Sequence, residues 1–311
     1  MIVERVVPPS RAAWLALRRQ DVTASQIGAL FGVHDFTSPY ALWVLKTGRV
    51  QDEIEETPAM QRGRLLEPVA VKLLHEDHPR WVIEHNSEAN VYFRSPAHRV
   101  GATPDVIVRA PDRGKGVVQI KSVEASVFRK KWLDEDGNVE APLWIVLQAT
   151  LEAHLVGASW AAVAPLVVGH GLEMPLIEIP LVEGVFVAML AKVDAFWTMV
   201  AEGREPHPDY GRDGEVIEAI YGDGNAENEI DLSADNRIRE LVAVRAMHRA
   251  AITHAHKMAD EIDAEVKAKL GSAHVAHLGQ GQRISWRPSR REGFFVAPST
   301  VRTLRYPTEK D

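Results

Sequence analysis

The chain contains no cysteine among its 311 residues. This absence excludes disulfide bonds, cysteine-ligated zinc or iron–sulfur centres and thiol catalysis, and it agrees with a reducing cytoplasm. The first residues lack the basic segment followed by an apolar run that marks a signal peptide, so we expect none. No apolar stretch is predicted to reach the roughly 18 residues that cross a bilayer, and Gln148, Glu152 and His154 interrupt the one that comes closest. The sequence therefore predicts a cytoplasmic protein without a membrane segment.

The chain also has no excess of positive charge, since its formal net charge is −7 at pH 7. This balance argues against a protein that coats DNA without specificity. It does not exclude a nuclease, because charge can be segregated along the chain and an acidic metal site is filled by cations. Residues 201–235 hold 11 acidic and two basic residues, whereas residues 281–311 hold three acidic and seven basic residues.

The remaining composition, 46% hydrophobic and 25% charged, is ordinary for a globular protein. The predicted order of helix, strands, helix, strands and helix gives a mixed α/β core of about 200 residues. We predict a folded domain over residues 1–205 and an acidic linker or loop over residues 206–232. A C-terminal extension over residues 233–311 would hold a long helix, a small β-hairpin and a basic tail.

Local patterns predict where the elements lie. Apolar residues at helical spacing, with caps and stops, predict helices at 11–19, 26–31, 40–47, 61–75, 144–156, 183–203 and 232–270. Short apolar runs predict strands at 82–84, 89–93, 100–102, 105–109, 116–122, 160–168 and 176–179.

The most informative segment covers residues 101–122. Asp105 begins one predicted strand, and a second predicted strand ends in Gln119-Ile120-Lys121. Gln119 and Lys121 lie two residues apart and therefore point to the same face, near Asp105 on the paired strand. An acid, a second oxygen ligand and a lysine suit metal-dependent phosphodiester cleavage, because hard cations prefer oxygen and a lysine offsets developing charge. On these residues alone an ordinary charged hairpin is the alternative.

Three further acidic or amide side chains are candidates for the same site. Glu67 lies in a predicted amphipathic helix, directly before Pro68, and its carboxylate can face the sheet or the solvent. Gln148 and Glu152 lie at i and i+4 on a later helix and share a face. Because that helix is mostly apolar, both side chains need polar partners, either each other or a metal site.

Arg18 and Ser25 form a different kind of candidate. An arginine beside a hydroxyl at a predicted helix start can hold a terminal phosphate, and a plain serine cap with a surface arginine is the alternative. The histidines show no metal-ligand spacing, so we interpret them as structural.

Seven segments in order resemble the YqaJ-like viral recombinases, relatives of phage lambda exonuclease in the PD-(D/E)XK nuclease superfamily. They are WLALRRQDVTASQIGALFG, SPYALWVLKTG, RGRLLEPVAVKLL, GATPDVIV, VVQIKS, LQATLEAHLVGASWAAVAPLVVG and DAFWTMVAEGREP. The resemblance implies a restriction-endonuclease-like core, a mixed central sheet flanked by helices, followed here by a helical C-terminal extension. It also implies a phage or prophage protein of the bacterial cytoplasm. The implied activity is a two-metal, Mg²⁺-dependent 5′-to-3′ exonuclease on linear double-stranded DNA, with Mn²⁺ as a substitute metal.

The resemblance implies partners and residue roles as well. The enzyme would leave a 3′ overhang for a single-strand annealing protein, and it would form a ring-shaped trimer around DNA. The implied roles fall on metal ligands Glu67, Asp105 and Gln119, catalytic Lys121, supporting Gln148, and 5′-phosphate ligands Arg18 and Ser25.

Gln119 departs from the family pattern, which has Asp or Glu at this position. Glu152 or Glu124 could supply the missing charge from a new place. Otherwise the chain would be a catalytically weakened nuclease fold that binds DNA ends or serves as a scaffold. A related nuclease that cuts internally, or acts on single strands, is a third reading.

Overall fold

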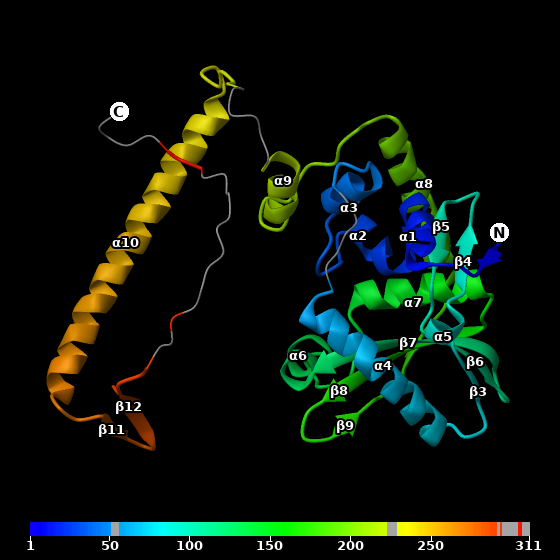
Figure 1. Cartoon of the computed structure of the whole chain (residues 1–311), viewed down its shortest axis with the longest axis horizontal. Coiled ribbons are helices and arrows are strands. Elements are labelled where there is room, and N and C mark those ends of the chain that lie inside the picture. The colour runs from blue at the N-terminus through cyan, green and yellow to red at the C-terminus, as the bar shows by residue number, and fades with distance from the viewer. Residues whose placement is uncertain (51–55, 223–228, 291–292, 294–303, 307–311) are drawn as a thin grey trace. The chain divides into compact units, whose positions relative to one another are not determined.

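The computed structural model describes residues 1–50, 56–222, 229–290, 293 and 304–306, without the side chain of Glu88. The chain forms two compact units, residues 1–221 and residues 222–311 (Figure 1). Each unit is described by itself.

A mixed sheet is the centre of the first unit. Its strand order is β10-β8-β7-β6-β3, and β9 pairs with β8. Neighbouring strands are antiparallel except for β7 and β8, which run parallel over their shared length. The strands are β3 (Val82–His85), β6 (Val106–Ala110), β7 (Gly114–Glu124), β8 (Trp160–Val168), β9 (Leu172–Glu173) and β10 (Ile177–Ile179).

Helices cover both faces of this sheet (Figure 1). Helix α4 (Pro58–Asp77) packs against the face that carries Val118 and Ile120 of β7. Helix α7 (Leu143–Val156) covers the opposite face, where Val117 of β7 is buried against it. Because side chains alternate along a strand, Gln119 and Lys121 leave β7 on the α7 side.

A second sheet has the strand order β1-β4-β5-β2. Helix α1 (Arg11–Gln20) leads into β2 through Asp21, which is fully buried. Arg94 donates two hydrogen bonds to the Asp21 carboxylate, at 2.9 and 3.0 Å, and the Tyr92 hydroxyl donates a third at 3.1 Å. The buried charge is therefore compensated, and it fixes the chain between Arg18 and Ser25. The strands are β1 (Glu4–Val6), β2 (Val22–Thr23), β4 (Tyr92–Ser95) and β5 (Val100–Ala102).

The remaining helices of the first unit surround these sheets. They are the 3₁₀ turn η1 (Ala24–Gln26), α2 (Ile27–Leu30), α3 (Pro39–Lys46), α5 (Asn86–Ala89), α6 (Ala125–Lys131), α8 (Glu183–Ala201) and α9 (Gly214–Tyr221). By length and composition α8 could cross a membrane, which the sequence prediction had not allowed. Its buried side chains, including Phe186, Met189 and Val193, lie in the main hydrophobic core, as in a core helix of a globular protein.

The second unit holds α10 (Asn236–Leu270), which begins at an Asp235 cap, and a hairpin of β11 (Val275–Gly279) and β12 (Gln282–Ser285). The long helix and hairpin predicted there are confirmed. The predicted basic tail lies largely outside the described residues.

The mixed α/β fold and its helix-flanked central sheet are confirmed, with local corrections. Residues 214–221 form α9 within the predicted linker, because Val216, Ile217 and Ile220 pack against the main core. The predicted strand at 89–93 begins at Tyr92, after the short helix α5. The helix predicted at 61–75 is confirmed, since α4 continues through Pro68 despite the loss of one backbone donor.

Candidate active site

One pocket brings most of the predicted site residues together. Its cavity volume is about 280 Å³. The residues that line it come from α1, the β2–η1 segment, α5, the end of β5, the turn between β5 and β6, β7 and α7. They are Trp14, Arg18, Thr23, Ala24, Ser25, Ser87, Ala102, Thr103, Asp105, Gln119, Lys121, Gln148 and Glu152.

Asp105 lies at the turn into β6, and the backbone around it is held in place. The Asn86 amide donates to the Pro104 carbonyl at 2.9 Å, and the Asn86 N–H donates to the Asp105 carbonyl at 2.9 Å. The Asp105 carboxylate accepts a hydrogen bond from the Ile120 N–H at 2.9 Å and another from the Gln119 amide. Paired strands β6 and β7 thus place the acid directly beside the Gln-x-Lys sequence.

A chain of polar side chains links β7 to α7. The Lys121 ammonium donates to the Gln148 side-chain oxygen at 3.0 Å, and the Gln148 amide donates to the Glu152 carboxylate at 2.9 Å. The indole of Trp144 lies 5.3 Å from the ammonium. The i, i+4 spacing on α7 therefore turns both Gln148 and Glu152 toward the lysine side of the sheet.

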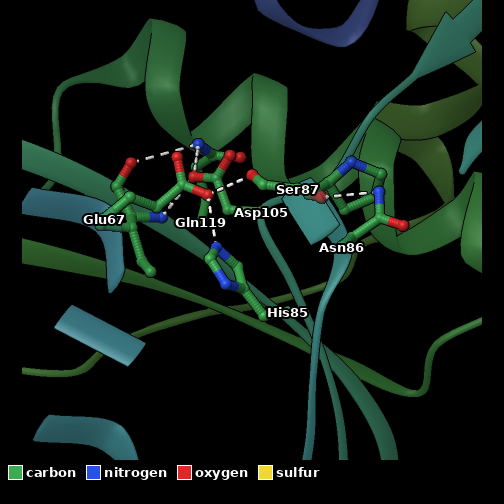
Figure 2. Close-up of polar contacts among 8 residues, drawn as sticks. Glu67, His85, Asn86, Ser87, Asp105 and Gln119 are labelled. Atoms are coloured by element: carbon green, nitrogen blue, oxygen red, sulfur yellow. Dashed lines mark hydrogen bonds and ion pairs between the residues drawn. The ribbon is translucent and has the colours of Figure 1, made fainter. Parts of the chain in front are cut away.

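Glu67 lies beside Asp105 and Gln119 (Figure 2). Its carboxylate accepts from the Ser87 hydroxyl and lies 2.8 Å from His85 Nε2. Figure 2 shows the polar ends of Glu67, Asp105 and Gln119 gathered in one place. His85 thus contacts a predicted metal ligand, and this contact is compatible with the structural role that we expect of the histidines.

Two buried oxygen atoms in the pocket residues lack a hydrogen-bond donor. Gln119 Oε1 and Glu152 Oε2 have no partner among the described residues. Gln119 is 2% exposed and Glu152 is 1% exposed. A buried acceptor without a donor costs about 1–3 kcal/mol. Two such atoms in one polar pocket indicate a site that is completed by a positively charged or donating group.

The two buried acids in the pocket hold protons tightly. Burial raises the pKa of Asp105 to about 7, and the nearby Glu67 charge adds to the rise while Lys121 opposes it. Burial raises the pKa of Glu152 to about 8, and the Asp105 charge raises it further. Both shifts have the same origin, since carboxylates that are removed from water without enough positive charge favour their neutral forms.

Arg18 and Ser25 line the same pocket. The Arg18 guanidinium lies 4.4 Å over the Trp14 ring and donates to the Ser25 hydroxyl at 3.4 Å. The Trp14 indole is itself fixed by a 3.0 Å hydrogen bond to Thr103. His34 Nε2 lies 3.0 Å from the Ser25 carbonyl. Trp14 and His34 therefore help to hold the Arg18 guanidinium and the Ser25 hydroxyl next to each other.

The predicted helix start at Ser25 takes a different form. Ser25 lies inside the one-turn segment η1, and Thr23 forms the capping box with Gln26. The following helix α2 has only four residues, too few for a helix-dipole contribution. Phosphate binding here would depend on the Arg18 guanidinium and on the hydroxyls of Thr23 and Ser25, which lie 3.1 Å apart.

Glu124 is not part of the pocket. It is exposed at the end of β7, and its carboxylate accepts from the Ser126 hydroxyl at 2.7 Å. Of the two acids that could replace the missing charge, the structure brings only Glu152 to Asp105 and Gln119.

The oxygen set suits a hard divalent cation. Among the described residues no group of three or more His, Asp or Glu side chains is placed to hold a metal ion. Asp105 and Glu152 contribute carboxylates to the pocket lining, Gln119 contributes an amide oxygen, and Glu67 adjoins them. Mg²⁺ and Mn²⁺ prefer such ligands, and the two unpartnered oxygens fit a role in binding one.

A family model supports the assignment that these residues suggest. The model of the YqaJ-like viral recombinase domain matches residues 13–159, a segment that includes every residue of the pocket. Residues 13–159, which are 147 of the 311 residues, thus resemble a YqaJ-like viral recombinase domain. The protein named Uncharacterized protein YqaJ from Bacillus subtilis strain 168 is 24% identical over 286 residues, covering 90% of this chain and 84% of that relative.

Several solved structures are distant neighbours of this chain. The alkaline exonuclease LHK-Exo from Laribacter hongkongensis is 19% identical, covers 66% of this chain and 98% of its own, and gives a TM-score of 0.44. A putative exonuclease from Eubacterium rectale is 12% identical, covers 73% and 98%, and gives 0.41. A SOX–DNA complex is 11% identical, covers 62% and 68%, and gives 0.41. The likeness to the YqaJ family rests on the domain match and on the Bacillus subtilis relative, and not on these distant structures.

Proposed function

We propose that this protein is a metal-dependent exonuclease that degrades linear double-stranded DNA from its 5′ ends. One observation carries the proposal: Arg18 and Ser25 line the same pocket as Asp105, Gln119 and Lys121. A group that binds a terminal phosphate, placed beside a group that cleaves a phosphodiester, favours removal of nucleotides from an end over cleavage at an internal position.

The side chains divide into a binding part and a reacting part. Arg18 would hold the terminal 5′-phosphate by charge-assisted hydrogen bonds, and Ser25 would add its hydroxyl. Glu67, Asp105 and Gln119 would hold Mg²⁺, or Mn²⁺ in its place. A bound divalent cation supplies Lewis-acid polarisation of the phosphate and lowers the pKa of a coordinated water.

Lys121 would act at the scissile phosphate. Its ammonium is fixed by the Gln148 oxygen at 3.0 Å, so it is oriented before the substrate arrives. A fixed positive charge stabilises the extra negative charge that develops on the phosphate oxygens in the transition state. Gln148 would therefore be a positioning residue, because it touches the lysine rather than the DNA.

The products and partners follow from the proposed polarity. Digestion of one strand from each 5′ end leaves a 3′ single-stranded overhang, which is the substrate of a single-strand annealing protein. The family resemblance motivates that partner and a trimeric ring.

One observation favours a second candidate function. Gln119 brings no charge where the family has an acid, so metal affinity could be too low for catalysis. The protein would then be a nuclease fold that binds DNA ends without cutting them.

A digestion assay separates these functions. Linear duplex DNA and the same DNA as a closed circle would be incubated with Mg²⁺, with Mn²⁺ and with EDTA. The exonuclease proposal predicts metal-dependent loss of the linear DNA alone. End binding without loss in either metal would support the second candidate, and nicking of the circle would indicate an endonuclease.

A further inference from the structure

The strand residues of the proposed cation site carry too little negative charge to hold a divalent cation well. Of the residues around the Gln-x-Lys sequence, Asp105 contributes one negative charge, Lys121 contributes one positive charge, and Gln119 is neutral. Mg²⁺ is held by carboxylates in protein sites, so a site made only from the strands would bind it weakly.

Helix α7, which covers the sheet, adds the Glu152 carboxylate to the same pocket. Glu152 is 1% exposed and lines the pocket with Asp105 and Gln119. One of its oxygens accepts from the Gln148 amide at 2.9 Å, and the other has no partner among the described residues. A carboxylate buried in this way is strongly disfavoured unless a positive charge compensates it.

We propose that Glu152 is the acid that replaces the missing strand carboxylate, so that it joins Glu67, Asp105 and the Gln119 amide oxygen as a ligand of the cation. The inference rests on the proposed function, since it assumes that this pocket binds a divalent cation. It adds a ligand that comes from the helix and lies outside the Asp…Gln-x-Lys pattern. The carboxylate would thus come from α7 rather than from β7.

The other acids nearby do not fill this role. Glu124 is exposed, lies outside the pocket and is bonded to Ser126. Glu67 is already a ligand in the proposed site and comes from α4, beside Ser87 and His85, so it does not replace the charge that is missing at Gln119.

The hydrogen bonds of the Gln119 side chain agree with a cation site that this residue shares with Asp105 and Glu152. Its amide nitrogen donates to Asp105, while its amide oxygen has no donor. Without a cation the amide hydrogens supply the partial positive charge next to Asp105. Rotation about the last side-chain torsion, which is broad for glutamine, would turn the unpartnered oxygen toward a cation beside that acid.

An exchange series tests the inference through metal binding rather than activity. The variants are Glu152→Gln, Gln119→Glu and the double variant Gln119→Glu/Glu152→Gln, with Glu124→Gln as a matched control on an exposed acid. Mn²⁺ affinity would be measured by calorimetry and by electron paramagnetic resonance on the full chain without DNA.

Glu152→Gln should weaken Mn²⁺ binding by about tenfold or more, because the site loses a ligand charge. The double variant should recover most of the wild-type affinity, and Glu124→Gln should match the wild type. Unchanged affinity in Glu152→Gln, or a double variant no better than Glu152→Gln, would overturn the role of Glu152 while leaving the exonuclease proposal in place. A wild type that binds no Mn²⁺ and cuts no DNA would instead overturn the proposed function, and with it this inference.

A measurement on the wild type covers the case in which Glu152→Gln does not fold. In crystals soaked in Mn²⁺, the anomalous signal should lie within bonding distance of a Glu152 oxygen. A Mn²⁺ ion bound by Asp105 with Glu152 outside its coordination shell would overturn the inference.

Discussion

The Lys121 ammonium donates to the side-chain oxygen of Gln148 at 3.0 Å, which joins the end of β7 to the middle of α7. The amide nitrogen of the same Gln148 side chain donates to the Glu152 carboxylate. A single amide therefore orients the lysine on one side and a buried acid on the other. The catalytic proposal depends on this link, because a mobile lysine would lose the advantage of preorganisation.

Lys121→Ala should reduce the turnover number by about 100-fold or more with little change in DNA affinity, because a preorganised charge acts mainly in the transition state. Single-turnover digestion and a DNA-binding titration with Ca²⁺ would measure the two quantities. Lys72→Ala, at an exposed lysine of α4, is the control and should leave both unchanged. A loss confined to DNA affinity would assign Lys121 to binding instead.

Asp105→Asn should abolish cleavage and keep the fold. The substitution removes a negative charge from a buried cluster, so the metal-free protein should melt at the same temperature or higher. Thermal unfolding in EDTA, followed by circular dichroism, checks the second part. Substantial activity in a folded Asp105→Asn protein would contradict the metal-ligand role.

Arg18→Ala should damage digestion of 5′-phosphorylated ends more than digestion of 5′-hydroxyl ends. A charge-assisted hydrogen bond contributes about 1.5–3 kcal/mol, which corresponds to roughly 10- to 150-fold in rate. Initial rates on two duplexes that differ only in the terminal phosphate give the comparison. Arg19→Ala, at the exposed neighbouring residue, should preserve the preference. An equal loss on both duplexes would show that Arg18 does not recognise the phosphate.

The metal-free protein should lose stability as the pH rises from about 5 to about 8. The pKa values of Asp105 and Glu152 are raised in the folded state, to about 7 and about 8, from the ordinary 3.8 and 4.5. In this range the folded state binds more protons than the unfolded state, so the free energy of unfolding falls with pH. Urea unfolding in EDTA at several pH values would measure this slope. Glu152→Gln should flatten it, and an unchanged slope in that variant would contradict the raised pKa of Glu152.

Much of the pocket could be predicted because it depends on local periodicity. The two-residue repeat of a strand places Gln119 with Lys121, and the i, i+4 repeat of a helix places Gln148 with Glu152. Both repeats survive in the structure because β7 and α7 are long, regular and largely buried. The packing of α7 on β7, which brings the two pairs together, required the arrangement of the whole unit.

Contacts between distant segments could not be predicted in the same way. Glu67 meets His85 and Ser87 only because α4 packs beside β3, and no periodicity in either segment indicates this. Helix α9 is similar, since the buried Asp213 that precedes it accepts a 2.6 Å hydrogen bond from Ser38, 175 residues away in the sequence. The composition of this segment, rich in glycine, proline and acids, predicted a loop there.

The most direct test of the proposed exonuclease is the fate of labelled ends. Linear duplex DNA with a 5′-phosphate would carry one fluorophore near its 5′ end and another at its 3′ end, with closed circular DNA as the control substrate and Mg²⁺ or Mn²⁺ as the metal. We predict early release of the 5′ label as short products, retention of the 3′ label on single strands, and an intact circle. Early loss of the 3′ label, cutting of the circle, or an unchanged linear duplex in both metals would contradict the proposal.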